Sequence, residues 1–140
     1  MKIIFLDIDG VLNCETTQER WERFVGIDQK LVSRFMNIIN QTGAKVVLSS
    51  TWRLEDNWRE VMAQNGLTCE FIDRTIHLPE QTRGQEIQNW LDNHSGTFEK
   101  YAIIDDNTDL LPNQIFFKTS MENGGLTEEI SQSVIKYLNA

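Results

Sequence analysis

Two aspartates separated by one residue follow the first apolar run of the chain. Asp7 and Asp9 come directly after Ile3–Leu6, and Gly10 follows them. Residues two apart on an extended chain face the same way, so both carboxylates can reach one site. The glycine lets the backbone turn away sharply after them. An isolated Asp-x-Asp is more often an ordinary strand end with solvated aspartates, so the pair needs support from the rest of the chain.

A second acidic pair follows a later apolar run. Tyr101–Ile104 ends at Asp105 and Asp106, with Asp109 nearby. Adjacent aspartates repel each other unless a cation or hydrogen-bond donors compensate. At the end of a buried strand such a pair suggests ligands for a hard metal ion. A solvated acidic turn remains the simpler explanation of the pair when it is considered alone.

Apolar runs that alternate with helical patterns surround these residues. The runs Ile3–Leu6, Val46–Leu48 and Tyr101–Ile104 predict buried strands, and two weaker strands are expected at Glu70–Ile72 and Ile115–Phe117. This alternation predicts an α/β fold, a Rossmann-like parallel sheet of about five strands with helices on both faces. Ligands bind beyond the carboxyl ends of such strands. All three strong strands end there in polar residues, the third set being Ser49, Ser50 and Thr51.

Four helices are expected from apolar positions at helical spacing. The first begins after Asp28 as N-cap, and the last begins after Thr127 as N-cap. Their expected apolar positions are Leu31, Val32, Phe35, Met36, Ile38 and Ile39; Leu54, Trp58, Val61 and Met62; Ile87, Trp90 and Leu91; and Ile130, Val134, Ile135 and Leu138. The stretches Gly10–Ile27 and Asp73–Arg83 show no regular pattern.

Composition limits the classes of function. The 140 residues fit one domain, 1–140, and the net charge of -8 argues against a broad nucleic-acid-binding or membrane-binding surface. No apolar run approaches the roughly 18 residues of a membrane span. Cys14 and Cys69 lack metal-type spacing and are expected as free thiols. These features predict a soluble cytoplasmic protein and leave its oligomeric state open.

The segment Ile4–Leu12 resembles the first motif of the haloacid dehalogenase-like (HAD) superfamily. The resemblance implies that Asp7 is a nucleophile and that Asp9 is the general acid and base of the phosphatase branch. It also implies a Mg²⁺ ion held by Asp7, by the backbone carbonyl of Asp9 and by Asp106. Asp105 would then orient ligands or water from outside the metal's coordination sphere, although the sequence leaves open which of Asp105 and Asp106 binds directly.

The later HAD motifs have matching residues in the required order. Ser49 fits the hydroxyl position after the second strand, and Ser50 would add its backbone N–H, although serines before a helix are also common caps. Arg83 matches the basic residue of the third motif, with Arg53 as the rival candidate. The resemblance thus implies that Ser49, Ser50 and Arg83 bind phosphate. Arg53 and Trp52 are assigned to substrate recognition.

The resemblance implies a small phosphatase without a cap domain, because neither inter-motif gap has room for one. The expected reaction is Mg²⁺-dependent hydrolysis of a phosphomonoester through an aspartyl-phosphate, on a small phosphorylated molecule, a nucleotide or a nucleic-acid end. The run Ser49–Arg53 also resembles a HAD subgroup that includes domains linked to RNA repair. Trp21, Phe24 and Trp52 are candidates for stacking on a base, although core packing is the common role of such residues. The alternatives are a non-catalytic scaffold on this fold and a receiver-like phosphoacceptor domain.

Overall fold

A five-stranded parallel sheet forms the centre of the molecule. The computed structural model describes residues 1–140, and its strand order is β5-β4-β1-β6-β7, with every neighbouring pair parallel. The strands are β1 (Lys2–Leu6), β4 (Lys45–Leu48), β5 (Phe71–Arg74), β6 (Lys100–Asp105) and β7 (Phe116–Lys118). This architecture confirms the predicted α/β fold with a parallel sheet of five strands.

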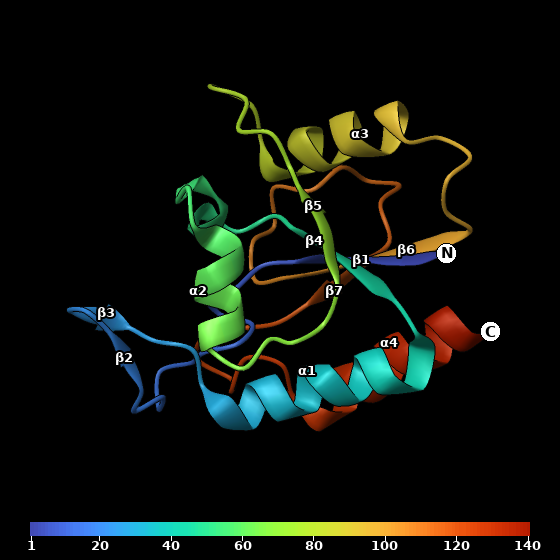
Figure 1. The fold of residues 1–140 in the computed structure, drawn as a ribbon. Helices are drawn as coiled ribbons and strands as arrows, with labels where there is room; N and C mark the ends of the chain where they lie inside the picture. The colour runs from blue at the N-terminus through green and yellow to red at the C-terminus, as the bar shows by residue number, and fades with distance from the viewer.

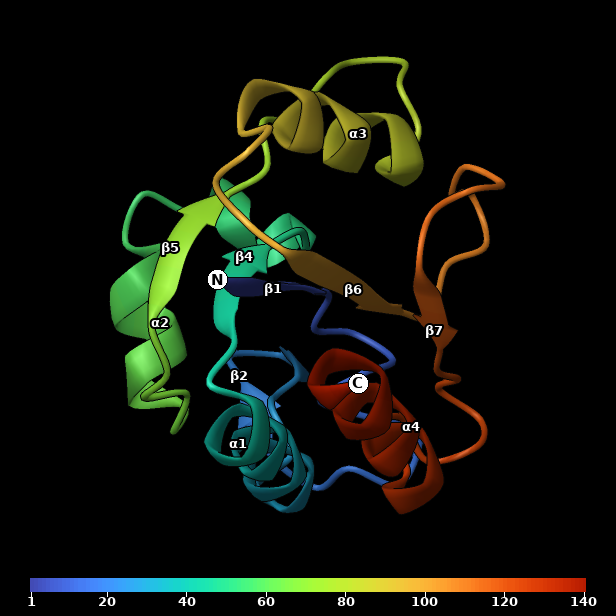
Figure 2. The same ribbon diagram turned by 90° about the vertical axis from the view of Figure 1, so that its right-hand side faces the viewer.

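Helices cover both faces of this sheet, as predicted. Figures 1 and 2 show one helix on one face and the others on the opposite face. The isolated helix is α3 (Arg83–Asn93), and the others are α1 (Gln29–Thr42), α2 (Trp58–Gln64) and α4 (Glu128–Asn139). Because parallel strands need crossover connections, the helices between them return the chain to the start of the next strand.

The sheet separates two apolar cores of unequal size. The larger one has 22 buried residues and joins the sheet to α1, α2 and α4. The smaller one has 7 buried residues under α3, where the Phe5 ring meets Trp90 edge to face at 5.4 Å between centroids. β1 contributes to both, because its alternate side chains point to opposite faces. This double burial explains why β1 is an unbroken apolar run in the sequence.

Local capping signals fix where the helices begin. Asp28 and Thr127 are the N-caps of α1 and α4, as predicted, since their side chains accept hydrogen bonds from Lys30 N and Ile130 N. Thr82 forms a capping box with Gln85 that starts α3. These caps place the first turn of α3, and therefore Arg83, at the carboxyl edge of the sheet.

Some predicted boundaries were wrong. β5 and β7 each begin one residue later than predicted, at Phe71 and Phe116. The helix expected over Leu54–Met62 is instead a 3₁₀ turn, η1 (Thr51–Leu54), followed by α2. Glu55 separates them, because its ψ of 138° is extended rather than helical. Leu54 is accordingly exposed rather than part of the apolar face.

The stretch between β1 and α1 contains a small hairpin that the sequence did not predict. β2 (Arg20–Trp21) and β3 (Phe24–Val25) pair antiparallel, and Glu22 in the turn has a φ of 56°. The hairpin extends beyond the carboxyl end of the sheet (Figure 1). It is too short to form a separate domain, and the structure has no cap domain, as predicted.

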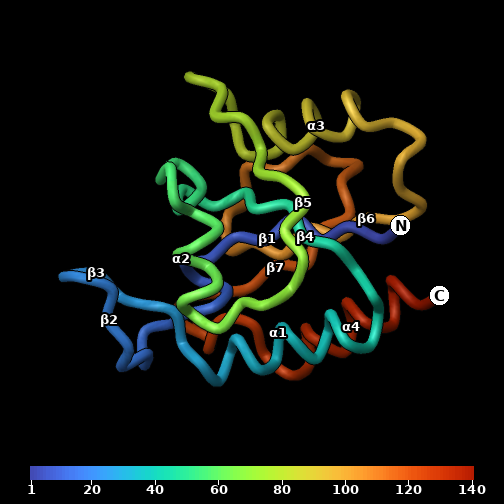
Figure 3. Tube along the Cα trace, in the orientation of Figure 1, coloured from blue at the N-terminus to red at the C-terminus, as the bar shows by residue number.

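The chain termini lie at the opposite end of the sheet from the hairpin, as the trace in Figure 3 shows. The Lys2 side chain donates to Asn139 there, at 3.2 Å between Nζ and Oδ1. Both cysteines are free thiols, as predicted. None of the helices combines the length and the hydrophobicity that crossing a bilayer would require.

Candidate active site

Three predicted site residues follow one another across neighbouring strands. Asp7 N donates to Ile104 O at 3.1 Å, and Ser49 N donates to Leu6 O at 2.9 Å. These bonds continue the ladders of β1 with β6 and β4, so Asp7 lies between the ends of its two neighbours. Asp105 is the last residue of β6. The structure therefore brings together the polar ends of the three strong strands.

Three carboxylates form the centre of this edge. One oxygen each from Asp7, Asp105 and Asp106 lie within 4.8 Å of one another. Gly10 permits this approach, because a Cβ at that position would overlap the Asp106 carboxylate. Its φ of +83° also favours glycine. The sharp turn after the first motif thus makes room for an acid from the fourth.

Arg83, the first residue of α3, contacts the carboxylate cluster. Its Nη1 lies 2.7 Å from Asp105 Oδ2 and 3.4 Å from Asp7 Oδ1. The Asp109 carboxylate accepts a hydrogen bond from Arg83 N at 3.2 Å and so helps to hold the start of α3. Asp109 thus caps the helix that carries Arg83. The structure brings Arg83, rather than Arg53, beside Asp7.

The two aspartates of the later pair have different surroundings. Asp105 is fully buried, and its oxygens receive hydrogen bonds from Arg83 Nη1 and from Asn107 N. Asp106 is half-buried and faces Asp7, and neither an arginine nor a backbone N–H donates to its oxygens. Asp106 therefore has its oxygens available for another ligand, whereas those of Asp105 are already engaged.

Crowding of negative charge alters the protonation of this cluster. Burial raises the pKa of Asp7 to about 9, and the Asp105 charge adds to the effect while Arg83 opposes it. Burial likewise raises the pKa of Asp105, against the influence of Arg83. A cation with a preference for oxygen ligands would relieve this repulsion. The donor set, which contains carboxylates and no sulfur or imidazole, therefore fits a hard divalent ion such as Mg²⁺.

The two serines after β4 have different roles in the local structure. Ser50 Oγ accepts from Trp52 N at 3.2 Å and caps the 3₁₀ turn, so it has the capping role that is common for serines before a helix. Ser49 is completely buried, and its Oγ has no hydrogen-bond partner. A buried hydroxyl without a partner is costly. Ser49 therefore carries a free donor at the edge of the sheet next to Asp7.

Arg53 is buried, with 2 % of its surface exposed. Its guanidinium donates to Ser49 O and Ser50 O, at 3.2 and 2.8 Å, and to Thr75 O at 2.9 Å. Glu86 Oε1 completes the set at 3.1 Å. Burial lowers the pKa of Arg53, against the attraction of Glu86. Arg53 thus supports the backbone of the serine loop, and its assignment to substrate recognition stays a prediction.

Asp9 lies on the solvent side of the site. Its carboxylate accepts from Asn13 Nδ2 at 2.8 Å and from Trp52 Nε1 at 3.2 Å. Asn13 is fully buried, and its Oδ1 accepts from Gly10 N at 2.8 Å. The same amide also donates to Gly26 O, at the base of the hairpin. Sequence reasoning missed Asn13, although its position four residues after Asp9 in a tight turn was the available signal.

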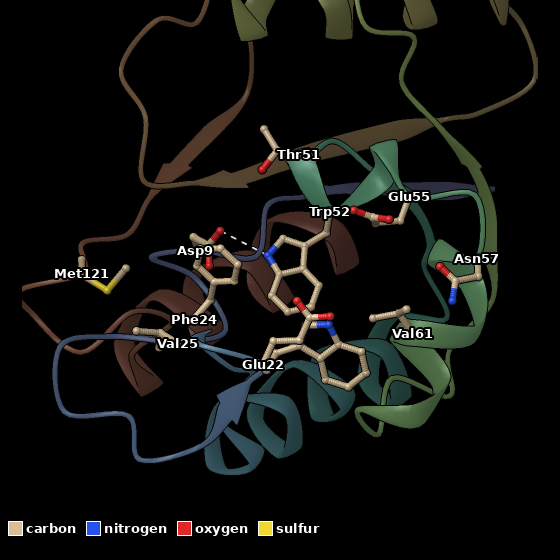
Figure 4. Close-up of a pocket in the computed structure, with 11 residues that line it drawn as sticks. Asp9, Glu22, Phe24, Val25, Thr51, Trp52, Glu55, Asn57, Val61 and Met121 are labelled. Carbon is tan, nitrogen blue, oxygen red and sulfur yellow. Dashed lines mark hydrogen bonds between the residues drawn. The ribbon is translucent and has the colours of Figure 1, made fainter.

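A pocket of about 610 Å³ opens beside Asp9 (Figure 4). One side is the hairpin, and the other is η1 with the start of α2. The rings of Trp21 and Trp52 lie 6.3 Å apart between centroids, tilted by 45°. The residues that line the pocket are Asp9, Trp21, Glu22, Phe24, Val25, Thr51, Trp52, Glu55, Asn57, Val61 and Met121. The aromatic residues suggested as candidates for base stacking thus meet at one place beside Asp9.

Comparison with known proteins agrees with this geometry. Neither the curated proteins nor the solved structures gave a match to the chain. A family model described as the HAD domain in Swiss Army Knife RNA repair proteins matches residues 3–130. That range contains every residue of the candidate site and nearly all of the sheet. The chain therefore belongs to the family of HAD domains found in Swiss Army Knife RNA repair proteins.

Proposed function

We propose that the protein is a Mg²⁺-dependent phosphatase that hydrolyses a phosphomonoester through an aspartyl-phosphate on Asp7. One observation carries the proposal. The Asp7 carboxylate ends the central strand within reach of Arg83 and of two further carboxylates. Such a cluster pairs a nucleophile with groups that neutralise the charge of a transferring phosphoryl group, which is the main requirement of phosphoryl transfer.

The reaction has two steps that use the same residues. An oxygen of Asp7 attacks phosphorus, the ester P–O bond breaks, and Asp9 gives its proton to the departing oxygen. A water molecule then attacks phosphorus, Asp9 takes its proton, and the bond from Asp7 to phosphorus breaks. General acid–base catalysis of this kind contributes about 10²–10⁴-fold. The hydrogen bonds from Asn13 and Trp52 support the role of Asp9, because they hold its carboxylate in one orientation.

The metal and the phosphate would be held by separate groups. Asp7, Asp106 and the backbone carbonyl of Asp9 would hold Mg²⁺, and Asp105 would orient this set while paired with Arg83. The ion, when bound, supplies positive charge that reduces repulsion between the nucleophile and the phosphate oxygens. Ser49 Oγ, Ser50 N–H and Arg83 would bind the phosphate. The unpartnered hydroxyl of Ser49 supports this assignment, since a phosphate oxygen would satisfy it.

The family points to the class of substrate. Its description places these domains in RNA repair proteins, and we propose that the phosphate is carried by a nucleotide or by a nucleic-acid end. The absence of a cap domain supports this view, because the site edge is open to a large substrate. Trp52 would contact that substrate, since it lines the pocket beside Asp9.

A phosphatase screen tests the proposal. Purified protein would be assayed with Mg²⁺ on an aryl phosphate, nucleotides, sugar phosphates, and oligonucleotides that carry 3′- or 5′-phosphates. We expect hydrolysis that excess chelator abolishes and that Mg²⁺ restores, with partial replacement by Mn²⁺. Asp7→Asn, purified in parallel, controls for contaminating phosphatases. Hydrolysis of none of these esters, or activity that survives both chelation and the substitution, would contradict the proposal.

A further inference from the structure

The pocket beside Asp9 is separate from the groups that would hold phosphate. Its lining includes Asp9 but none of Asp7, Ser49, Arg83, Asp105 or Asp106. If Asp9 protonates the departing oxygen, as the proposed function requires, the pocket lies on the side of the leaving group. The kind of leaving group that the site accepts can then be inferred from the pocket, and this inference rests on the proposed function.

The walls of the pocket suit a flat apolar group. Trp21, Phe24 and Trp52 supply three aromatic rings, and Phe24 is 58 % exposed. Exposed aromatic surface in a hollow marks a place where another apolar surface binds. The Trp52 ring is fixed by its hydrogen bond to Asp9, as Figure 4 shows. A ring held against Trp52 would therefore be positioned relative to the proton donor.

The charges of the pocket are all of one sign. Asp9, Glu22 and Glu55 belong to its lining, and no lysine or arginine does. Arg23 lies over the Phe24 ring, 5.4 Å from its centroid, but is not part of the lining. The phosphate side, in contrast, has Arg83. The negative charges of Asp9, Glu22 and Glu55 disfavour an anionic group in this pocket, especially where aromatic walls reduce solvent screening.

We propose that this pocket binds an uncharged planar ring of the leaving group, and that Glu22 and Glu55 exclude a second anionic group beside that ring. A nucleobase is the ring of this kind that a nucleotide supplies, so of the two substrates in the proposed function the inference favours the nucleotide. The volume of about 610 Å³ lies within the roughly 300–1,000 Å³ of typical small-ligand pockets. The site would thus select a nucleoside monophosphate over a sugar phosphate or a nucleoside bisphosphate.

The ring preference can be measured with two esters that share a leaving oxygen. Adenosine 5′-monophosphate and ribose 5-phosphate differ only at the anomeric carbon, which bears adenine in one and a hydroxyl in the other, so the ratio of their kcat/KM values reports on the ring. We expect the ratio to exceed about tenfold and to fall by about 5- to 100-fold in Trp21→Ala, the range for one stacked base. Ile76→Ala removes an exposed apolar side chain outside the pocket and should keep the wild-type ratio.

The charge preference has its own measurement. Adenosine 3′,5′-bisphosphate should be hydrolysed with a kcat/KM several-fold below that of adenosine 3′-monophosphate or adenosine 5′-monophosphate, whichever of these two is hydrolysed faster. The double variant Glu22→Gln, Glu55→Gln should reduce that difference, because both side chains keep their size and lose their charge. An unchanged difference in the double variant would overturn the role of the two glutamates.

The outcomes separate this inference from the proposed function. Hydrolysis of adenosine 5′-monophosphate and ribose 5-phosphate with equal kcat/KM overturns the ring site and leaves the phosphatase standing. Absence of hydrolysis overturns the proposed function. The ring site is then tested without any phosphate, by measuring whether adenosine quenches the tryptophan fluorescence of the protein. Quenching that is lost in Trp21→Ala and kept in Ile76→Ala supports the ring site, and absence of quenching overturns it.

Discussion

The two sides of the candidate site are built in different ways. The inner side, made of Asp7, Ser49, Arg83 and Asp105, comes from the ends of buried strands and the start of α3, and its side chains are almost inaccessible. The outer side, made of Asp9, Asn13, Trp52 and the hairpin, comes from the turn after β1, the hairpin and η1, and it borders an open pocket, although Asn13 itself is buried. Under the proposed function, the sheet would fix the groups that break the bond, while the hairpin and η1 would select what approaches them.

The largest effect is expected on the inner side, from Asp7→Asn. Asparagine keeps the shape of the side chain but lacks the charge for attack on phosphorus, so turnover should be abolished. The fold should remain, because the substitution also removes a buried carboxylate from a repulsive cluster. Steady-state assays with circular dichroism check both statements. Retained turnover in pure, folded protein would refute the nucleophile assignment.

A smaller loss is expected on the outer side, from Asp9→Asn. The loss should be about 10²–10⁴-fold on an alkyl ester, whose leaving oxygen needs a proton. An aryl ester should instead give a burst of aryl alcohol followed by slow turnover, because only hydrolysis of the aspartyl-phosphate still needs the base. Rapid-mixing kinetics on both esters would show it. Equal losses without a burst would remove Asp9 from the acid–base role.

Asn13→Ala should have a milder effect on activity than Asp9→Asn. The substitution leaves the Gly10 N–H and the Gly26 carbonyl without a partner, and unpaired buried groups cost about 1–3 kcal/mol each. We expect a lower melting temperature and, on an alkyl ester, a fall in kcat of about tenfold because Asp9 is less well oriented. Asn13→Asp retains the acceptor for Gly10 N and serves as the matched variant. Wild-type kcat in Asn13→Ala would show that Asp9 needs no such support.

A further expected effect concerns stability alone and is a pH dependence of the metal-free protein. The folded chain keeps a proton on Asp7 up to a pKa of about 9, whereas the unfolded chain loses it near 3.8. The folded state therefore binds more protons in this window, and the free energy of unfolding should fall as pH rises, by at most about 1.4 kcal/mol per pH unit for one proton. Denaturant titrations from pH 5 to 9 measure this slope. Asp7→Asn should reduce it, and an undiminished slope would assign the effect to other groups.

The same contrast explains what the sequence could predict. Each strong strand was recognisable, because double burial leaves an unbroken apolar run that stops at polar residues. The caps at Asp28 and Thr127 were recognisable because they depend only on the neighbouring backbone. The family resemblance gave the order of the motifs. These signals are local or depend on the central sheet, and they predicted that Asp7, Ser49 and Asp105 lie together at one edge of the sheet, where the structure has them.

Features that depend on distant contacts were not predicted. The hairpin has only two residues in each strand, too few for an alternating pattern. The choice between Arg53 and Arg83 depends on which guanidinium the tertiary fold turns toward Asp7. Arg53 is held inside by Glu86, which is distant in sequence and gave no sign of this pairing. The anchoring of Asp9 by Trp52 likewise joins two motifs across the site.

The buried pair of Arg53 and Glu86 has a consequence for how the protein tolerates change. Arg53 holds the carbonyl groups of the serine loop, and Glu86 lies one turn after Arg83 on α3, so the pair ties two elements of the candidate site to each other. Loss of one partner leaves an unpaired charge in the interior, which typically destabilises a protein by about 3–5 kcal/mol, whereas loss of both together is often tolerated. Positions 53 and 86 should therefore behave as one unit in a library of random variants. Survivors would carry the native pair or apolar residues at both positions, and a survivor with a single charged partner should be rare.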